Sequence, residues 1–260
     1  MFGSLHRKSL NASTARRTLA ALAIGGVIAL AGSTAQAADL PGVFSGNALA
    51  TAATVKAGPL SAILARGAYQ GCACQGTGGQ VKSNEVDGIS APGILTANST
   101  ISTVYTKKTA TTAEVQNTST VGGFTALGGL ITADSIRSVA TADATKHAVS
   151  TSSDGSSFGN LIVAGQVIPA TVPANTVIPL PGIGSVTLNR IAVSGTMKKA
   201  GAIDVEALNI TVSTKNALGL PVGTRIIVAH TIAGYNHKEP PAAFGGDTYA
   251  ALASGSLGDD

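Results

Sequence analysis

Two cysteines separated by one residue are the most individual chemical feature of this sequence. Cys72-Ala73-Cys74 is followed by Gln75 and a glycine-rich stretch. In an exported chain we expect such a pair to form a disulfide. The same residues leave three alternatives open. The first is an intermolecular crosslink. The second is a redox-active pair, because strained disulfides are easily reduced. The third is metal binding, in which the two thiolates would supply only half of the four ligands of a zinc ion.

The acids and histidines form no recognisable catalytic pattern. Asp204 and Glu206 alternate along one expected strand, and we interpret them as a solvated strand face rather than as the carboxylate pair of a glycosidase. His230 continues an apolar strand, and we interpret it as a hydrogen-bonded or rim residue. The sequence has no phosphate-binding loop. We therefore expect no catalytic residue, metal ion or cofactor.

Residues 1–37 have the pattern of a secretory signal peptide. Basic residues precede an apolar run over 19–30, and Ala35-Gln36-Ala37 is a small-x-small cleavage site. We expect cleavage between Ala37 and Ala38. The apolar run is shorter than the about 20 residues that span a bilayer, so we expect no transmembrane anchor after cleavage. Arg16-Arg17 raises twin-arginine export as an alternative to the Sec route.

The charge balance excludes nucleic acid as a partner. Of the 17 basic residues, four precede Ala38, whereas all 13 acidic residues follow it. The remainder of the chain therefore carries 13 charges of each sign and has no net electrostatic attraction for a polyanion. Only 12% of the residues are charged and 44% are hydrophobic, which is typical of a folded domain rather than a disordered one.

Residues 38–234 are expected to form a single all-β domain, followed by a flexible Gly/Ala/Ser-rich tail over 235–260. The sequence is rich in Thr, Val, Ile, Ser and Ala, and helical periodicity is poor. Turns are expected at Asp87-Gly88, Asp154-Gly155, 180–182 and 220–223. Strands are expected over 44–55, 93–106, 130–145, 185–193, 202–213 and 224–232. Phe124 and Phe158 are expected to be the larger members of a core of Ile, Val, Leu and Ala.

Several expected strands change their alternation midway. In 203–212, the apolar residues occupy odd positions first and even positions after Ala207. Val186 and Leu188 give way to Ile191 and Val193 in the same manner. A strand has a period of two, so the change predicts a bulge or a strand that passes between sheets. We therefore predict an antiparallel sandwich or distorted barrel with bulged strands.

A short internal repeat suggests a second architecture. Gly93-Ile-Leu-Thr-Ala-Asn-Ser99 resembles Gly129-Leu-Ile-Thr-Ala-Asp-Ser135 at an offset of 36 positions. The two copies are consistent with a duplicated hairpin. A short β-solenoid is the alternative fold, although a solenoid normally shows at least three repeats.

Three segments resemble the choice-of-anchor P family, a group of secreted actinobacterial proteins. They are 128–134, 158–170 and 175–189, the last being the most specific, and 205–212 and 226–234 extend the likeness. The resemblance implies surface location, but it supplies no activity and no catalytic residue. The chain ends in Leu257-Gly-Asp-Asp260 without a sorting motif, so we do not expect covalent attachment to the wall.

These observations favour an exported, non-catalytic protein of the cell envelope or extracellular space, with a structural or binding role. The expected contacts of a neutral, hydroxyl-rich β domain are cell-wall polymer, glycan or copies of itself, reached through strand faces and edges. The alternative is a secreted enzyme whose site is assembled from residues scattered along the sequence.

Overall fold

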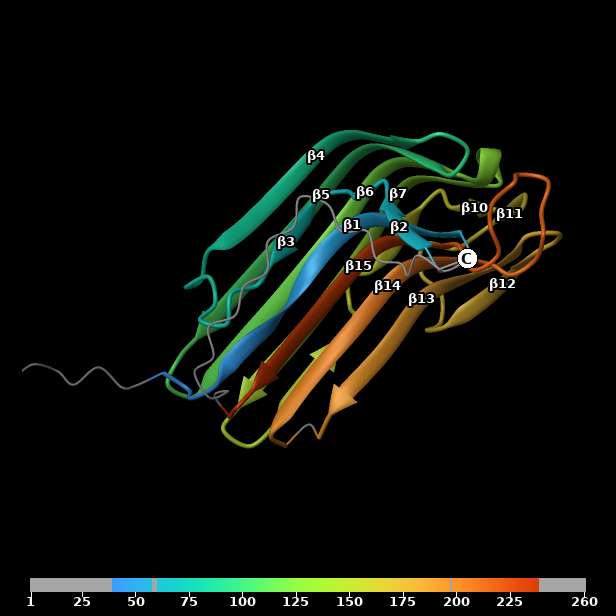
Figure 1. Cartoon of the computed structure of the whole chain (residues 1–260). Coiled ribbons are helices and arrows are strands. Elements are labelled where there is room, and N and C mark those ends of the chain that lie inside the picture. The colour runs from blue at the N-terminus through green and yellow to red at the C-terminus, as the bar shows by residue number, and fades with distance from the viewer. Residues whose placement is uncertain (1–38, 58–59, 197, 239–260) are drawn as a thin grey trace, which may run out of the picture. The chain divides into compact units, whose positions relative to one another are not determined.

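A computed structural model describes residues 39–57, 60–196 and 198–238, which fold into two antiparallel sheets packed face to face (Figure 1). Sheet A has the order β12-β13-β14-β15-β1-β2, with β3 also paired to β1. Its strands are β1 (Val43–Ala57), β2 (Leu60–Leu64), β3 (Tyr69–Gly71), β12 (Thr176–Leu180), β13 (Gly184–Gly195), β14 (Ala200–Val212) and β15 (Arg225–Asn236).

Sheet B has the order β11-β10-β7-β6-β5-β4, with β8 and β9 also paired to β7. Its strands are β4 (Val81–Ala91), β5 (Leu95–Lys108), β6 (Thr112–Ala126), β7 (Ile131–Thr145), β8 (Val149–Ser152), β9 (Ser157–Gly159), β10 (Ile162–Val163) and β11 (Gln166–Val167). A 3-10 turn, η1 (Leu127–Gly129), follows β6. The predicted sandwich is confirmed, and the fold is not the alternative solenoid. No helix in the described part of the chain reaches the length and hydropathy that crossing a bilayer requires.

The core between the sheets consists of two apolar clusters. The larger cluster contains Phe124 and Phe158, as predicted, with Ile, Val, Leu and Ala side chains around them. The smaller cluster contains Phe44 and Tyr235, whose ring centroids lie 5.4 Å apart in an edge-to-face arrangement. Edge-to-face geometry is favoured because the positive edge of one ring meets the negative face of the other.

A belt of buried polar side chains lies between these two clusters. Ser102, Ser119 and Ser138 occupy one cross-strand row of sheet B, and all three are fully buried. Ser138 donates a hydrogen bond to the carbonyl oxygen of Val205 in sheet A at 3.1 Å. Buried hydroxyls are stable only where they are hydrogen-bonded. Small side chains here allow the hydroxyls of one sheet to reach the backbone of the other.

The predicted change of alternation is confirmed in sheet A, but its cause is not an inserted residue. The pairs Leu188–Leu208 and Arg190–Glu206 keep the same register on either side of Asn189. Asn189 adopts a left-handed φ of 48°, and two strands away Ala229 adopts 51°. On β13 and β15, a single left-handed residue turns the strand so that the following side chains exchange faces. The predicted bulge is therefore a kink without an inserted residue. We call a row of such kinks across neighbouring strands a crease.

Sheet B has a corresponding crease across its strands. Its row comprises Gly88, Asn98, Gly123, Asp134 and Asn160, at which the ladder is interrupted while the register is kept on both sides. Gly88, Gly123 and Asn160 have φ values of 66°, 59° and 49°. The turn predicted at Asp87-Gly88 is therefore wrong, because Gly88 lies inside β4. A glycine with positive φ signals a turn and a crease equally well.

The six predicted strands correspond to β1, β5, β7, β13, β14 and β15. Strands β4 and β6 were not predicted, because their Gly, Asn and Gln residues are typical of loops. Strand β15 continues to Asn236, and Tyr235 is buried, so the domain extends beyond the predicted boundary at residue 234. The predicted signal peptide, the cleavage position Ala37/Ala38 and residues 239–260 of the predicted tail lie outside the described residues.

Candidate functional site

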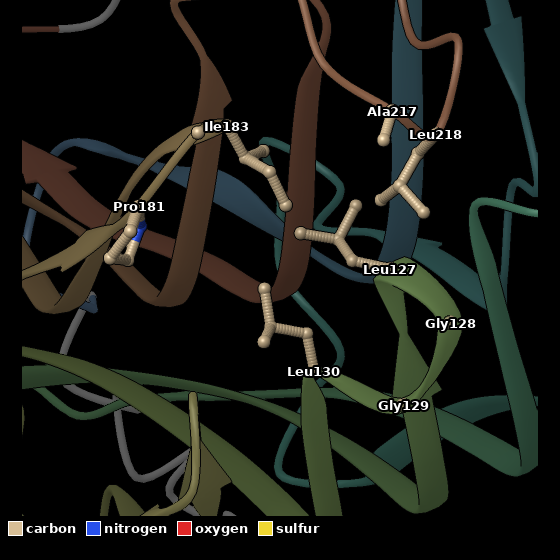
Figure 2. Close-up of a pocket in the computed structure, with 9 residues that line it drawn as sticks. Leu127, Gly128, Gly129, Leu130, Pro181, Ile183, Ala217 and Leu218 are labelled. Atoms are coloured by element: carbon tan, nitrogen blue, oxygen red, sulfur yellow. The ribbon is translucent and has the colours of Figure 1, made fainter.

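An apolar hollow of about 530 Å³ opens at one end of the sandwich (Figure 2). Three connections that are distant in sequence form its wall: η1 with Leu130, the β12–β13 turn, and the loop between β14 and β15. Figure 2 shows Leu127, Ile183 and Leu218 converging from these three connections.

Local sequence explains the shape of each connection. Gly128 and Gly182 have φ values of 67° and 73°, which allow the tight turns after β6 and β12. Asn216 holds the loop between β14 and β15: its Nδ2 donates to the Leu220 carbonyl oxygen at 2.8 Å, and its Oδ1 accepts from the Leu220 N–H at 3.1 Å. Asn side chains commonly organise loops in this way.

The lining of the hollow offers apolar contact and no reactive group. Its nine residues are Leu127, Gly128, Gly129, Leu130, Pro181, Gly182, Ile183, Ala217 and Leu218. Leu127 and Ile183 belong to the larger core cluster, so the hollow opens directly onto the core. Leu218, on the solvent side of the hollow, is 42% exposed. Ligand sites typically have volumes of about 300–1,000 Å³ and mainly apolar walls. This hollow therefore suits an alkyl or similar apolar group.

A second cluster gathers Asp204, Glu206 and His230 on β14 and β15. The Nε2 atom of His230 lies 3.0 Å from Asp204 Oδ1, so the interpretation of His230 as a hydrogen-bonded residue is confirmed. Only 4% of the Glu206 side chain is exposed. The expectation that both acids form a solvated strand face is therefore wrong for Glu206, because flanking side chains cover it.

Two arginines neutralise this cluster. Arg225 donates to both oxygens of Glu206, at 2.6 and 2.8 Å, and Arg190 Nη1 lies 3.3 Å from Glu206 Oε1. Burial alone raises the pKa of Asp204, but the hydrogen bond and charge of His230, with the charges of Arg190 and Arg225, outweigh it and lower the pKa. Although the three candidate ligand atoms lie within 4.8 Å of one another, a divalent cation would have to displace guanidinium groups. We therefore interpret the cluster as an ion-pair network.

The predicted disulfide is not formed in the structure, where Cys72 and Cys74 are both free. Each cysteine is held to β1 by its backbone: the Cys72 N–H donates to the Gly46 carbonyl, and the Cys74 carbonyl accepts from Phe44. The Cys72 side chain packs against the smaller core cluster, whereas Cys74 is exposed. In extended backbone, the Cα atoms of residues i and i+2 lie about 6.6 Å apart, near the upper limit for a disulfide. Burial, and secondarily the charge of Cys74, raises the pKa of Cys72 to about 11.

The apolar hollow was not predicted from the sequence. Its turn at 180–182 was predicted, but nothing in the sequence indicated that this turn meets η1 and the loop around Leu218. The one local feature that could have indicated the hollow is the leucine of Asn216-Ala217-Leu218, an apolar side chain that lies in a loop and that the structure shows to be exposed.

Comparison with protein-family models, curated proteins and solved structures finds no match to this chain. The resemblance to the choice-of-anchor P family therefore stays a prediction, and the fold and the geometry of the hollow are the basis for a functional proposal.

Proposed function

We propose that this chain is an exported, non-catalytic protein of the cell envelope or extracellular space that binds an apolar group in the hollow at the end of its sandwich. The observation that carries the proposal is the hollow itself, whose walls come from three connections and whose floor is the core. General acid–base and nucleophilic chemistry require a group that transfers a proton or attacks. None of the nine lining residues has such a side chain.

Export is supported by the signal-peptide pattern of residues 1–37. Fractionation of producing cells with intact mass measurement tests it: we expect the protein outside the cytosol, beginning at Ala38. Cytosolic material that begins at Met1 would refute this part of the proposal.

A series of alcohols tests the binding site. Each methylene transferred from water contributes about 0.8 kcal/mol, or about fourfold in affinity. We expect decanol to bind about 15-fold more tightly than octanol, because it buries two more methylenes. Calorimetric titration measures the affinities, and chemical shifts of the Leu127, Ile183 and Leu218 methyl groups locate the ligand.

A charge at the mouth provides the matched comparison. Leu218→Asp places a carboxylate against the apolar lining and should abolish decanol binding, since burying an unpaired charge is costly. Val193→Asp introduces the same charge at an exposed valine near the other end of β13 and should leave binding unchanged. Equal affinities of the two variants would contradict the proposed site.

A further inference from the structure

A second, polar hollow of about 400 Å³ lies over the crease of sheet B. Asn98, Asp134 and Asn160 of the crease line it, and Asn160 Nδ2 donates to Asp134 Oδ2 at 2.6 Å. A Cβ atom on Gly123 would lie 2.3 Å from Asn98 Nδ2, so the glycine leaves room for this amide. The crease therefore gathers two amides and one carboxylate at a single place on the sheet.

Threonine hydroxyls line the adjacent row of the same hollow. Thr96, Thr125 and Thr132 pair directly across β5, β6 and β7, and Ile162 continues the row on β10. No Lys, Arg or His lines the hollow. Phosphate and carboxylate ligands are typically bound by those residues. Amides and hydroxyls both donate and accept hydrogen bonds, so this lining suits a neutral ligand with several hydroxyl groups.

The internal repeat in the sequence explains the two walls of the polar hollow. The copies at 93–99 and 129–135 begin β5 and β7, on either side of β6. Thr96 and Thr132 occupy the threonine row, and Asn98 and Asp134 occupy equivalent places in the crease. The repeat thus supplies a matching pair of polar side chains on opposite sides of Gly123.

A third hollow shares lining residues with both the polar and the apolar hollow. This intermediate hollow, of about 140 Å³, shares Thr96 and Thr125 with the polar hollow and 127–129 with the apolar one. Its remaining lining residues include Ile94, Leu95 and Ala126. Four residues of extended chain separate Gly123 from Leu127, or about 13 Å at 3.3 Å per residue. A single molecule of moderate length can reach both ends.

We propose that the ligand is a neutral amphiphile, with a hydroxylated head such as a sugar in the polar hollow and an apolar chain in the hollow at the end of the sandwich. This inference rests on the proposed function, because it assigns the apolar hollow to the chain of the same ligand. The head forms hydrogen bonds with Asn98, Asp134 and the threonine row, and the chain follows the intermediate hollow toward Leu127.

Three probes separate this inference from the proposed function: decyl β-D-maltoside below its micelle concentration, decanol and maltose. We expect decyl maltoside to bind more tightly than decanol. Asn98→Ala and Asp134→Ala should each lower the affinity for decyl maltoside about fivefold, the effect of losing one hydrogen bond. Neither variant should change the affinity for decanol. Gln116→Ala removes an exposed polar side chain at the other end of β6 and should change neither affinity.

The outcomes are distinguishable. If decanol binds and the two variants leave decyl maltoside unaffected, the polar head site is refuted while the proposed function stands. If maltose binds as tightly as decyl maltoside, the two hollows do not serve one amphiphile. If neither alkyl compound binds, the proposed function itself fails.

Discussion

The hydroxyl oxygens of Ser138 on β7 and Thr231 on β15 lie 2.7 Å apart and link the two sheets in the middle of the core. Along β7, Ile136 belongs to the larger apolar cluster and Ala140 to the smaller, so Ser138 lies between them. The sandwich therefore has two separate apolar cores joined by a hydrogen-bonded centre.

This pair predicts a non-additive effect on stability. Ser138→Ala leaves the fully buried Thr231 hydroxyl without this partner, and we expect the free energy of unfolding to fall by about 1–3 kcal/mol. Thr231→Val should cost a similar amount. The double variant should cost less than the sum of the two, because no buried hydroxyl remains unpaired. Urea denaturation measures the effect, with the exposed Ser150→Ala as control, and strictly additive losses would contradict the prediction.

The buried carboxylate of Glu206 should contribute strongly to stability. Glu206→Gln removes the charge that holds Arg190 and Arg225, and we expect a loss of about 2 kcal/mol, typical of hydrogen bonds to charged groups. Because the arginines already neutralise this acid, Zn²⁺ or Ca²⁺ should not raise the melting temperature of the unmodified protein. Thermal denaturation with and without these ions tests both statements. A metal-dependent increase would show that the cluster is a metal site.

Asp204 and Asp143 should affect the pH dependence of stability in opposite directions. The folded pKa of Asp204 is lowered, so its contribution is present above pH 3.8 and is lost as the pH falls through the folded pKa. Burial raises the folded pKa of Asp143 above 3.8. The contribution of this residue to stability is therefore lost as the pH rises from 3.8 through the folded pKa. At pH 7, Asp204→Asn should destabilise the protein and Asp143→Asn should not. Urea denaturation between about pH 2.5 and 7, the range in which carboxyl groups titrate, should show the Asp204 effect disappearing at the acid end.

The two cysteines should behave as free thiols with different reactivities. The thiolate is the reactive form, and with a pKa of about 11, only about one Cys72 in a thousand is ionised at pH 8. Iodoacetamide should therefore modify the exposed Cys74 first, and the Cys72 rate should rise about tenfold per pH unit below its pKa. Peptide mass mapping measures both sites. Denatured protein with no reactive thiol would reinstate the disulfide.

Two glycines in the crease of sheet B provide a matched test of its packing. Gly88 and Gly123 have similar φ values, 66° and 59°, but nothing lies within 4 Å of a Cβ on Gly88. Gly88→Ala should cost only the strain of a left-handed alanine, about 1 kcal/mol. Gly123→Ala should cost more and displace the Asn98 side chain. Comparison of urea midpoints and of the Asn98 side-chain amide resonances tests this, and equal effects would contradict the described packing.

The sequence alone determined the class of fold, most long strands and the positions where they change face. Alternation of apolar residues is a local property, so 203–212 revealed both its strand and the switch after Ala207. Strands β4 and β6 were not recognised, because their glycines and amides serve the crease rather than turns. Asp87-Gly88 was misread for the same reason: the sign of φ is local, but whether the chain reverses depends on the strands that pair with it.

Tertiary structure alone decided the sites. Leu127, Ile183 and Leu218 meet only because β6, β12 and β14 end on the same side of two packed sheets, and no short-range pattern encodes that meeting. Burial of Glu206 likewise depends on Arg190 and Arg225 from the neighbouring strands. The repeat at 93–99 and 129–135 was visible in the sequence, but its meaning required the register that places Asn98 and Asp134 on either side of Gly123. Strand order fixes which distant residues become neighbours, and the free energy that selects that order is summed over the whole core.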